Sequence, residues 1–374
     1  MKIVPATIVF IVMCTIAVAQ SPAVPRNIFI ITTDGLRWQE VFTGADSALL
    51  HNPSHVRDTS ILAQQYWDTT GGLRRQKLMP FFWNVIAKKG QLYGNRLLNS
   101  KVDVANFYKI SYPGYNEIFT GYADNRFLPN IPVANSNTNI LEFLNQQKEY
   151  AGKVVAFGSW TIFPYILNEN RSKFPVNSGY ENLDESDSTN TLINKLQEGV
   201  ASKNNTRHDD LTYAGAKEYI EQNHPKVAFI GFGETDHFAH QGKYDMYLQR
   251  ANDVDRMIAE LWYYVQTDPF YKNNTLFIIT TDHGRGSKPS TWWTHSFLTK
   301  GSGEAWLAVL GPDIAPMGEM KDSPKIYQKQ IAATVAMLLD EHFEANHPVA
   351  KPISLPISKD HDRMMVASLN SMLK

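Results

Sequence analysis

Three short apolar runs are the strongest feature in the pattern of hydrophobic and polar positions along the chain. They are Asn27–Thr33 (NIFIITT), Val227–Phe232 (VAFIGF) and residues 276–281 (LFIITT), each continuous and rich in β-branched residues. Unbroken apolar runs of this length are typical of strands that are buried on both faces of a parallel sheet. We therefore predict three central strands at these positions.

Segments with a helical period lie between the apolar runs. The clearest places apolar side chains on one face of a helix and charged side chains off it. The apolar set is Leu248, Ala251, Val254, Ile258, Leu261 and Val265. We also expect strands at 153–157 and 305–310 and a late helix at 326–339. Strands that alternate with helices predict an α/β fold, with a mostly parallel central sheet and helices on both faces.

Two longer stretches, near residues 42–79 and 161–210, interrupt this alternation. We interpret them as insertions that form loops or a small cap in a single domain over residues 20–374, where specificity for a ligand would lie. Within the second stretch, residues 182–190 and 201–210 are rich in Asn, Asp and Ser. This composition predicts surface loops.

The first 19 residues have the pattern of a secretory signal peptide. Lys2 precedes an apolar stretch over residues 8–16, and Ala17-Val18-Ala19 has the small residues that a signal peptidase recognises. The apolar stretch is shorter than the roughly 20 residues that cross a bilayer, so no stable membrane anchor is expected after cleavage. We predict a periplasmic or secreted protein, and Cys14, the only cysteine, would be removed with the signal peptide.

Composition and charge narrow the classes of partner. The 374 residues are 43% hydrophobic, which is enough for a large core, and 36 Lys and Arg balance 37 Asp and Glu. The sequence contains no basic run or stripe of the kind that binds nucleic acids. We therefore expect a small molecule as the partner, and no nucleic acid.

Each of the three predicted strands runs into an aspartate. Asp34 follows the first strand directly, Asp236 follows the second after three residues, and Asp282 comes at the end of the third. Any one of them could be a simple turn residue. Ligands collect beyond the carboxyl ends of strands in open α/β sheets, so the three carboxylates are expected to converge. Carboxylates that meet without cations repel one another, and bound metal removes this conflict.

Three histidines complete a set of metal ligands. Asp236 and His240 are four residues apart, which places both side chains on one face of a helical turn. His283 is adjacent to Asp282, and His295 follows in a short loop. Three carboxylates and three imidazoles divide into two mixed oxygen and nitrogen sites, which suit Zn²⁺, with Mn²⁺ as the alternative. We predict two divalent metal ions.

The order of these motifs resembles the alkaline phosphatase superfamily, which includes nucleotide pyrophosphatase/phosphodiesterases, cofactor-independent phosphoglycerate mutases and sulfatases. The resemblance covers most of the mature chain and implies an alkaline-phosphatase-like catalytic domain. Its motifs are Thr33-Asp34-Gly35, Asp236-x-x-x-His240, Asp282-His283-Gly284 and His295. It implies that one metal is held by Asp236, His240 and His295, and the other by Asp34, Asp282, His283 and the nucleophile.

The same resemblance assigns the nucleophile to Ser111. The stretch from Ser111 to Gly121 (SYPGYNEIFTG) lines up with the superfamily pattern T-F-P-N-H-Y-T-x-x-T-G at a helix start. Pro113 is tolerated in a first helical turn, whose free N–H groups favour an anionic substrate. Without the metal ligands, Ser111 would be interpreted as a helix cap. The implied reaction is a double displacement through Ser111, with Asn130 as the donor to a non-bridging oxygen.

The branch of the superfamily depends on what surrounds the serine. Sulfatases modify a residue in C/S-x-P-x-R, and here Tyr115 stands where arginine is required, so a sulfuric ester hydrolase is the weaker alternative. Some monoesterases carry Lys-x-Arg after the strand at 153–157, but residues 158–164 (GSWTIFP) contain no cation. Trp160 and Phe163 would either pack on an organic substituent of a diester or belong to the core. The choice between monoester and diester is left open.

Two further functions are alternatives to an ester hydrolase of this kind. A phosphoglycerate mutase is disfavoured because that branch has a large inserted domain and works in the cytosol. A non-catalytic, metal-stabilised binding protein is the alternative from another class, and the intact ligands together with a serine argue against it. The favoured function is an exported, metal-dependent phosphoric ester hydrolase, either a phosphatase or a phosphodiesterase.

Overall fold

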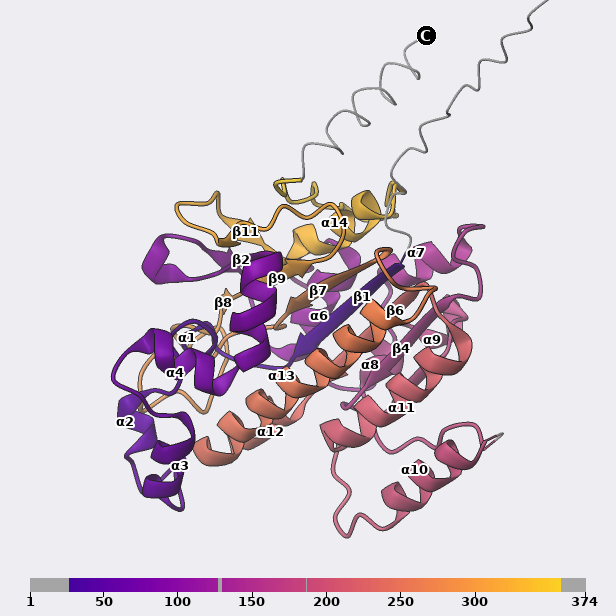
Figure 1. Cartoon of the computed structure of the whole chain (residues 1–374). Coiled ribbons are helices and arrows are strands. Elements are labelled where there is room, and N and C mark those ends of the chain that lie inside the picture. The colour runs from indigo at the N-terminus through magenta and orange to yellow at the C-terminus, as the bar shows by residue number, and fades with distance from the viewer. Residues whose placement is uncertain (1–26, 127–129, 186, 358–374) are drawn as a thin grey trace, which may run out of the picture.

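An eight-stranded sheet forms the centre of the structure (Figure 1). The computed structural model describes residues 27–126, 130–185 and 187–357, so the expected signal peptide at 1–19, with Cys14, lies outside the described residues. The strands of the sheet are β1 (Asn27–Thr33), β2 (Gln91–Tyr93), β4 (Val154–Gly158), β5 (Val176–Ser178), β6 (Val227–Phe232), β7 (Thr275–Thr280), β9 (Leu307–Leu310) and β10 (Gly318–Glu319). Their order is β10-β2-β9-β7-β1-β6-β4-β5.

The sheet is mostly parallel, as predicted. β1 lies between β6 and β7, with Ile31 opposite Ile230 on one side and Ile279 on the other. β4 and β5 extend the parallel part beyond β6. Among the described strands of this sheet, β9 alone pairs antiparallel, with β2 and β7. A second, three-stranded sheet consists of β3 (Val102–Asp103), β8 (Glu304–Ala305) and β11 (Ile326–Tyr327).

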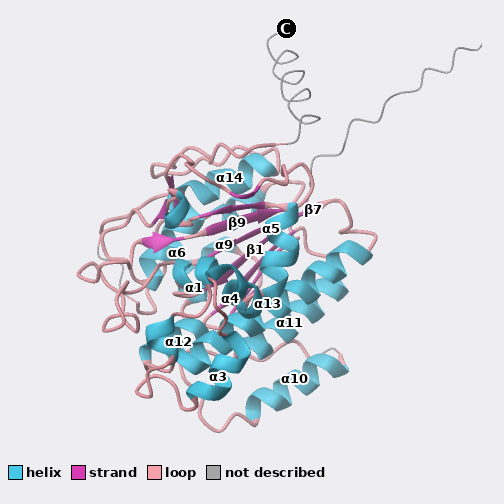
Figure 2. Ribbon diagram, turned by 60° about the vertical axis from the view of Figure 1, so that its left-hand side comes forward, coloured by secondary structure: helices cyan, strands magenta, loops and turns pink. Residues whose placement is uncertain are grey.

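Helices cover both faces of the central sheet, which confirms the predicted α/β architecture. α11 (Asp209–Asn223) and α13 (Tyr244–Thr267) lie over one face. α6 (Ser111–Thr120), α7 (Ile140–Gln146) and α14 (Ile331–Leu338) lie over the other. Figure 2 shows the strands enclosed between these helices. No described helix combines the length and the apolar character that crossing a bilayer requires.

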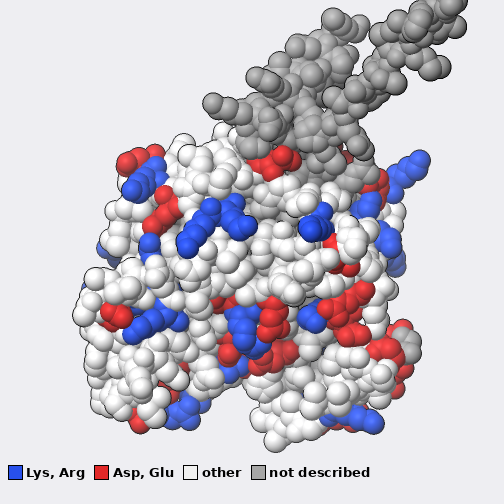
Figure 3. Space-filling model, viewed as in Figure 1, with Lys and Arg blue, Asp and Glu red and all other residues white. Residues whose placement is uncertain are grey.

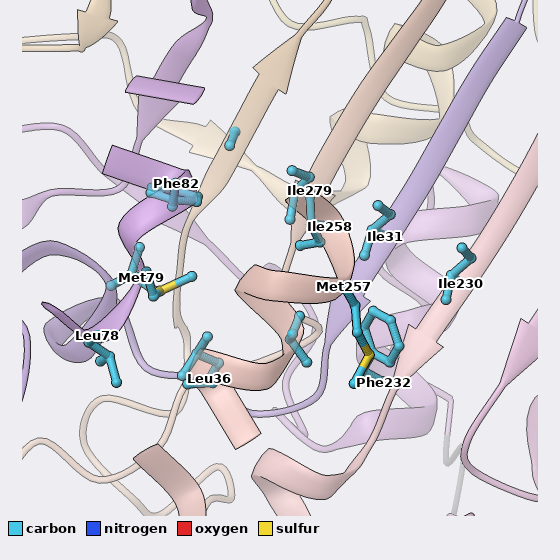
Figure 4. Packing of buried hydrophobic residues seen from close by; sticks show 14 of the residues in the cluster. Ile31, Leu36, Leu78, Met79, Phe82, Ile230, Phe232, Met257, Ile258 and Ile279 are labelled. Carbon is cyan, nitrogen blue, oxygen red and sulfur yellow. The ribbon is translucent and has the colours of Figure 1, made fainter. Parts of the chain in front are cut away.

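The continuous apolar runs are explained by cores on both sides of the sheet. Odd-numbered apolar residues of β1 belong to one core cluster and even-numbered ones to the other, because successive side chains of a strand point to opposite faces. On the first side, Met257 and Ile258 of α13 lie beside Ile31 and its neighbours on the sheet (Figure 4). The predicted amphipathic helix therefore closes this face together with α11.

The remaining helices are short and lie in the connections. They are α1 (Trp38–Thr43), α2 (Ser47–Leu50), α3 (Thr59–Tyr66), α4 (Gly71–Leu78), α5 (Ala87–Lys89), α8 (Phe163–Ile166), α9 (Glu169–Ser172), α10 (Ser188–Glu198) and α12 (Glu234–His240), with single turns η1 (Phe82–Ile86), η2 (Arg96–Leu98) and η3 (Gln328–Gln330). The stretch at 42–79 thus contains three of these helices, and the stretch at 161–210 contains α8 to α10 and the edge strand β5. The loop expected at 182–190 is shorter in the structure: α10 begins at Ser188, because the Asp187 side chain accepts from the Asn190 N–H and caps the helix.

Two predicted elements differ in the structure. The single strand expected at 305–310 is split at Trp306, where the chain leaves the small sheet and enters the central one. The buried Trp306 indole donates to the Leu36 carbonyl and holds this crossing point. The helix expected at 326–339 begins only at Ile331, because Ile326 and its neighbour pair with β3 as a strand.

Charged side chains of both signs lie among one another on the face seen in Figure 3. Inside the molecule, the ion pair of Arg37 and Glu40 is buried completely: the Arg37 guanidinium donates to the Glu40 carboxylate at 2.9 Å, and both residues are at most 2% exposed. Glu40 also accepts from the Tyr244 hydroxyl of α13, and Arg37 donates to the Gly286 carbonyl beyond β7. The pair therefore ties α1 to α13 and to the loop that follows β7.

We expect Glu40→Gln to lower the free energy of unfolding by about 3 to 5 kcal/mol, because it leaves the buried Arg37 cation without its counter-charge. Urea unfolding at saturating metal measures this change. Glu260→Gln is the matched control, since it removes an exposed partner of Arg256 at 2.8 Å, and its cost should stay below about 1 kcal/mol. Equal losses in the two variants would contradict the assignment.

Candidate metal centre and nucleophile

Three adjacent parallel strands bring the three aspartates to one edge of the sheet. Asp34 follows β1, Asp236 lies on α12 after β6, and Asp282 follows β7. The strand ends are joined across the edge: the Asp34 N–H donates to the Phe232 carbonyl at 2.9 Å, and the Gly35 N–H donates to Asp282 Oδ1 at 3.0 Å. Residues that lie almost 250 positions apart in sequence therefore become neighbours.

One group of side chains combines Asp236, His240 and His295. The one-turn spacing on α12 brings His240 Nε2 to 3.4 Å from Asp236 Oδ2, and the loop after β7 brings His295 Nε2 to 3.5 Å from Asp236 Oδ1. The two imidazole Nε2 atoms are 2.9 Å apart. The ligand atoms lie within 4.8 Å of one another, a spacing that a single metal ion can bridge.

A second group surrounds Nε2 of His283. This atom lies 3.2 Å from Ser111 Oγ, 3.3 Å from Asp282 Oδ2 and 3.5 Å from Asp34 Oδ1. Nδ1 of the same ring lies 2.9 Å from the Gly284 carbonyl, which holds the ring with Nε2 toward the carboxylates. Asp236 is close enough to Asp34 and His283 to be shared, so it lies between the two groups.

Two carboxylate oxygens show that the site suits a cation. Asp34 Oδ1 and Asp282 Oδ2 are buried and have no hydrogen-bond partner, although both face His283 Nε2. A buried carboxylate oxygen without a donor is costly, and a divalent cation satisfies it directly. The set of carboxylates and imidazoles therefore fits a divalent metal ion.

Burial controls the protonation of these groups in the absence of metal. It raises the pKa of Asp34 well above its usual value, with a further contribution from the Asp282 charge, and it raises the pKa of Asp282 to about 8. Burial lowers the pKa of His283, and it lowers the pKa of His295 to about 4. Both imidazoles are thus neutral and ready to bind a metal at neutral pH. Burial acts to raise the pKa of Asp236 as well, but Arg285 and the nearby histidines outweigh it and hold this pKa well below its usual value.

Ser111 is the first residue of α6, as the motif predicts, and it is almost completely buried. The helix packs tightly on the end of β7, because a Cβ on Gly114 would lie 2.4 Å from the Asp282 carbonyl oxygen. Asn130 Oδ1 accepts from the Tyr112 N–H at 2.9 Å, so the structure brings Asn130 to the first turn of α6. This bond uses the amide oxygen, so the amide nitrogen of Asn130 remains as its donor group.

Arg285 is a residue of the site that sequence reasoning missed. Its buried guanidinium forms an ion pair with Asp236, and it donates to the carbonyls of Trp292 and Trp293. Gly35 has a positive φ of 60°, and a Cβ there would lie 2.6 Å from Arg285 Nη1, so glycine is required at this contact. The sequence feature that could have indicated Arg285 is its position, a cationic residue two residues after His283.

Tyr115 and Phe163 also have roles that the motifs did not reveal. Tyr115 lies one helical turn after Ser111, and its hydroxyl is 3.2 Å from Asp34 Oδ2, so it orients a carboxylate of the second group. Phe163 is a core residue, 1% exposed, whose ring fills the space beside Gly158 and Gly231. It is therefore not available to pack on a substrate.

The fold is α/β, and carboxylates and imidazoles that could hold a metal ion are grouped at one edge of its central sheet. A sequence model described as the Metalloenzyme superfamily matches residues 131–302, which include Asp236, His240, Asp282, His283 and His295. The architecture is alkaline-phosphatase-like, as the solved structures below show. Curated protein sequences yield no match to this chain.

Three solved structures illustrate the likeness. A variant of the alkaline phosphatase PafA is 11% identical, with 90% of this chain and 100% of that chain covered and a TM-score of 0.59. Murine ectonucleotide pyrophosphatase/phosphodiesterase 5, in complex with AMP, is 13% identical, with coverage of 89% and 100% and a TM-score of 0.54. BT1596, a 2-O GAG sulfatase, is 12% identical, with coverage of 87% and 73% and a TM-score of 0.55. At this identity the likeness establishes the fold alone.

The metal-free protein should lose thermal stability as the pH rises from 6.5 to about 8. A carboxyl whose pKa is raised on folding holds a proton that the unfolded chain has released, so stability falls as pH rises toward the folded pKa. The lowered pKa values of His283 and His295 act in the opposite direction, but only below their unfolded value of 6.5.

Thermal unfolding in the presence of a chelator measures how the stability of the metal-free protein changes with pH. Because Asp282 has a folded pKa of about 8, it accounts for at most about 2 kcal/mol across this interval, and Asp282→Asn should flatten the slope. An unchanged slope in this variant would contradict the account.

We expect Arg285→Gln to bind the metal at the Asp236 group about tenfold more tightly, because it removes a buried positive charge beside the cation position. Competition with a chromogenic chelator measures this affinity without using turnover. Arg285→Lys retains the charge and should change the affinity less. Weaker binding in the glutamine variant would show instead that Arg285 serves to hold Asp236 in place.

Proposed function

We propose that this chain is a hydrolase of phosphoric esters that uses Ser111 as its nucleophile and two divalent metal ions. The observation that carries the proposal is the 3.2 Å contact between Ser111 Oγ and His283 Nε2, at the start of a helix and beside two groups of metal ligands. Such an arrangement is typical of covalent catalysis by an activated hydroxyl.

Each predicted ligand has a place in the proposal. Asp236, His240 and His295 would hold one metal, whereas Asp34, Asp282, His283 and Ser111 would hold the other, with Zn²⁺ favoured over Mn²⁺ by the imidazole content. When bound, the metals would neutralise the carboxylates and lower the pKa of the Ser111 hydroxyl. Ser111 is only 5% exposed, which limits the access of water to its oxygen before the substrate binds.

The reaction then follows from the positions of the chain's own groups. Ser111 Oγ loses its proton and attacks phosphorus, the phosphorus–oxygen bond to the alcohol breaks, and the alcohol leaves with a proton. Water hydrolyses the resulting phosphoserine, which restores the serine and releases phosphate or a phosphate monoester. The N–H groups at the start of α6 favour the anionic phosphoryl group. Asn130, anchored on Tyr112, is proposed as the donor to a non-bridging oxygen.

A sulfuric ester hydrolase is the second candidate, since a sulfatase is among the structures of similar fold. The position where the sulfatase motif requires arginine is occupied here by Tyr115, which donates to Asp34. This contact favours an unmodified serine at position 111. Mass spectrometry of the peptide that contains Ser111 tests the point, because a formylglycine there would favour the sulfatase.

Export completes the proposal, on the basis of Lys2, the apolar stretch at 8–16 and Ala17-Val18-Ala19. Sequencing of the mature N-terminus tests it. A chain that begins at Gln20 supports export, and a mature chain that keeps Met1 would contradict it.

Ser111→Ala should retain its metals and lose hydrolysis of an aryl phosphate ester by at least about a thousandfold, because the covalent step is removed. The measurement combines elemental analysis with steady-state rates on phosphate monoesters, phosphate diesters and sulfate esters. Ser60→Ala, an exposed change on α3, should keep both the metals and the rate.

Three other outcomes would argue against the proposal. Full turnover by Ser111→Ala would eliminate the covalent route. A parent protein that is active only on sulfate esters would favour the second candidate. A metal-loaded parent that hydrolyses none of the esters would favour a binding protein.

A further inference from the structure

Two aromatic side chains stack on each other at the surface, although neither belongs to the core. Phe107 and Phe297 have ring centroids 4.9 Å apart and an interplanar angle of 28°. They are 56% and 48% exposed, and both lie outside the two core clusters. Large exposed apolar side chains that gather in one place are typical of binding surfaces. Core packing does not account for this pair.

The pair joins the two segments that carry Ser111 and His295. Phe107 lies four residues before Ser111, and Phe297 lies two residues after His295. The segments are held together where the Lys109 carbonyl lies 3.2 Å from His295 Nδ1. The aromatic pair is thus continuous with the candidate site.

The loop that carries Phe297 has two other exposed apolar side chains. Leu298 is 81% exposed and Trp293 is 42% exposed. On the other side, the Phe107 N–H donates to Asn125 Oδ1 at 3.1 Å, which anchors the loop before Ser111. The aromatic pair therefore rests on backbone that is fixed by hydrogen bonds from both segments.

The direction of the reaction indicates which part of a substrate would meet this surface. In an in-line displacement the leaving oxygen lies opposite the attacking one. Ser111 Oγ is next to His283, so the leaving oxygen would face the group of Asp236, His240 and His295. Phe297 follows His295 by two residues, and the segment of Phe107 contacts His295 through the Lys109 carbonyl, so the pair is placed toward the side from which the leaving alcohol would depart.

We infer that Phe107 and Phe297 form a subsite for the leaving group of the ester, and that this leaving group is a bulky alcohol with an aromatic ring. The inference rests on the proposed function. Stacking on an aromatic face favours a planar ring over a small alkyl group. The subsite sets the preference among esters and takes no part in bond breaking.

The test compares two phosphate esters whose alcohols have the same acidity, a phenyl ester and a small fluoroalkyl ester. The double variant Phe107→Ala with Phe297→Ala should lose about fivefold to tenfold in kcat/KM on the phenyl ester, as expected for lost ring stacking. Its kcat/KM on the fluoroalkyl ester should stay unchanged. Tyr263→Ala is the matched control, because Tyr263 is 72% exposed and lies near the far end of the 24-residue helix α13.

Two results would overturn the inference while the proposed function stands. One is an equal change on both esters, including no change on either. The other is a parent protein that sedimentation shows to be a dimer, and a double variant that is a monomer with the same preference between the esters. The aromatic pair would then be a contact between two copies of the chain. A parent that hydrolyses neither ester would instead contradict the proposed function itself.

Discussion

The repulsion among three carboxylates buried at one sheet edge is the constraint on which the rest of the structure depends. Asp34, Asp236 and Asp282 are brought together by three parallel strands, and two of their oxygens are buried without any hydrogen-bond partner. Such an arrangement is costly unless positive charge is supplied or the carboxyls are protonated. Arg285 supplies charge to Asp236, and burial raises the pKa values of the other two. A divalent cation satisfies the remaining carboxylate oxygens, so the edge of the sheet where the three aspartates meet fits a divalent cation.

The surrounding fold serves to keep this edge rigid. The two cores on either side of the sheet fix β1 between β6 and β7, and α13 closes one face over them. Close backbone contacts then set the details: Gly35 leaves room for Arg285, and Gly114 lets α6 approach the Asp282 carbonyl. The buried pair of Arg37 and Glu40 holds the loop after β7 against α13. The same contacts therefore stabilise the fold and hold the side chains of the candidate site in position.

The sequence predicted the parts of the fold that depend on local pattern. The bounds of β1 and β6 agree with the apolar runs, and β7 is displaced by one residue. All six predicted ligands and Ser111 meet at the edge, because the ends of adjacent parallel strands must lie together. The parts that the sequence left open or did not indicate depend on distant partners. Arg285 became recognisable only once Asp236 lay beside it, and Phe163 was assigned to the core only by the space that Gly158 and Gly231 leave for its ring. The helices of the stretch at 42–79 carry little hydrophobic periodicity, so their caps at Asp46, Asp58 and Thr70 define them.

The most direct test of the central claim is the location of metal ions by anomalous X-ray scattering in crystals of the zinc-loaded protein. The account predicts two peaks about 3.5–4 Å apart, one bound by Asp236, His240 and His295 and the other by Asp34, Asp282 and His283 with Ser111 Oγ in contact. Peaks confined to other parts of the surface, or a fully loaded protein whose Ser111 Oγ touches no metal, would contradict it.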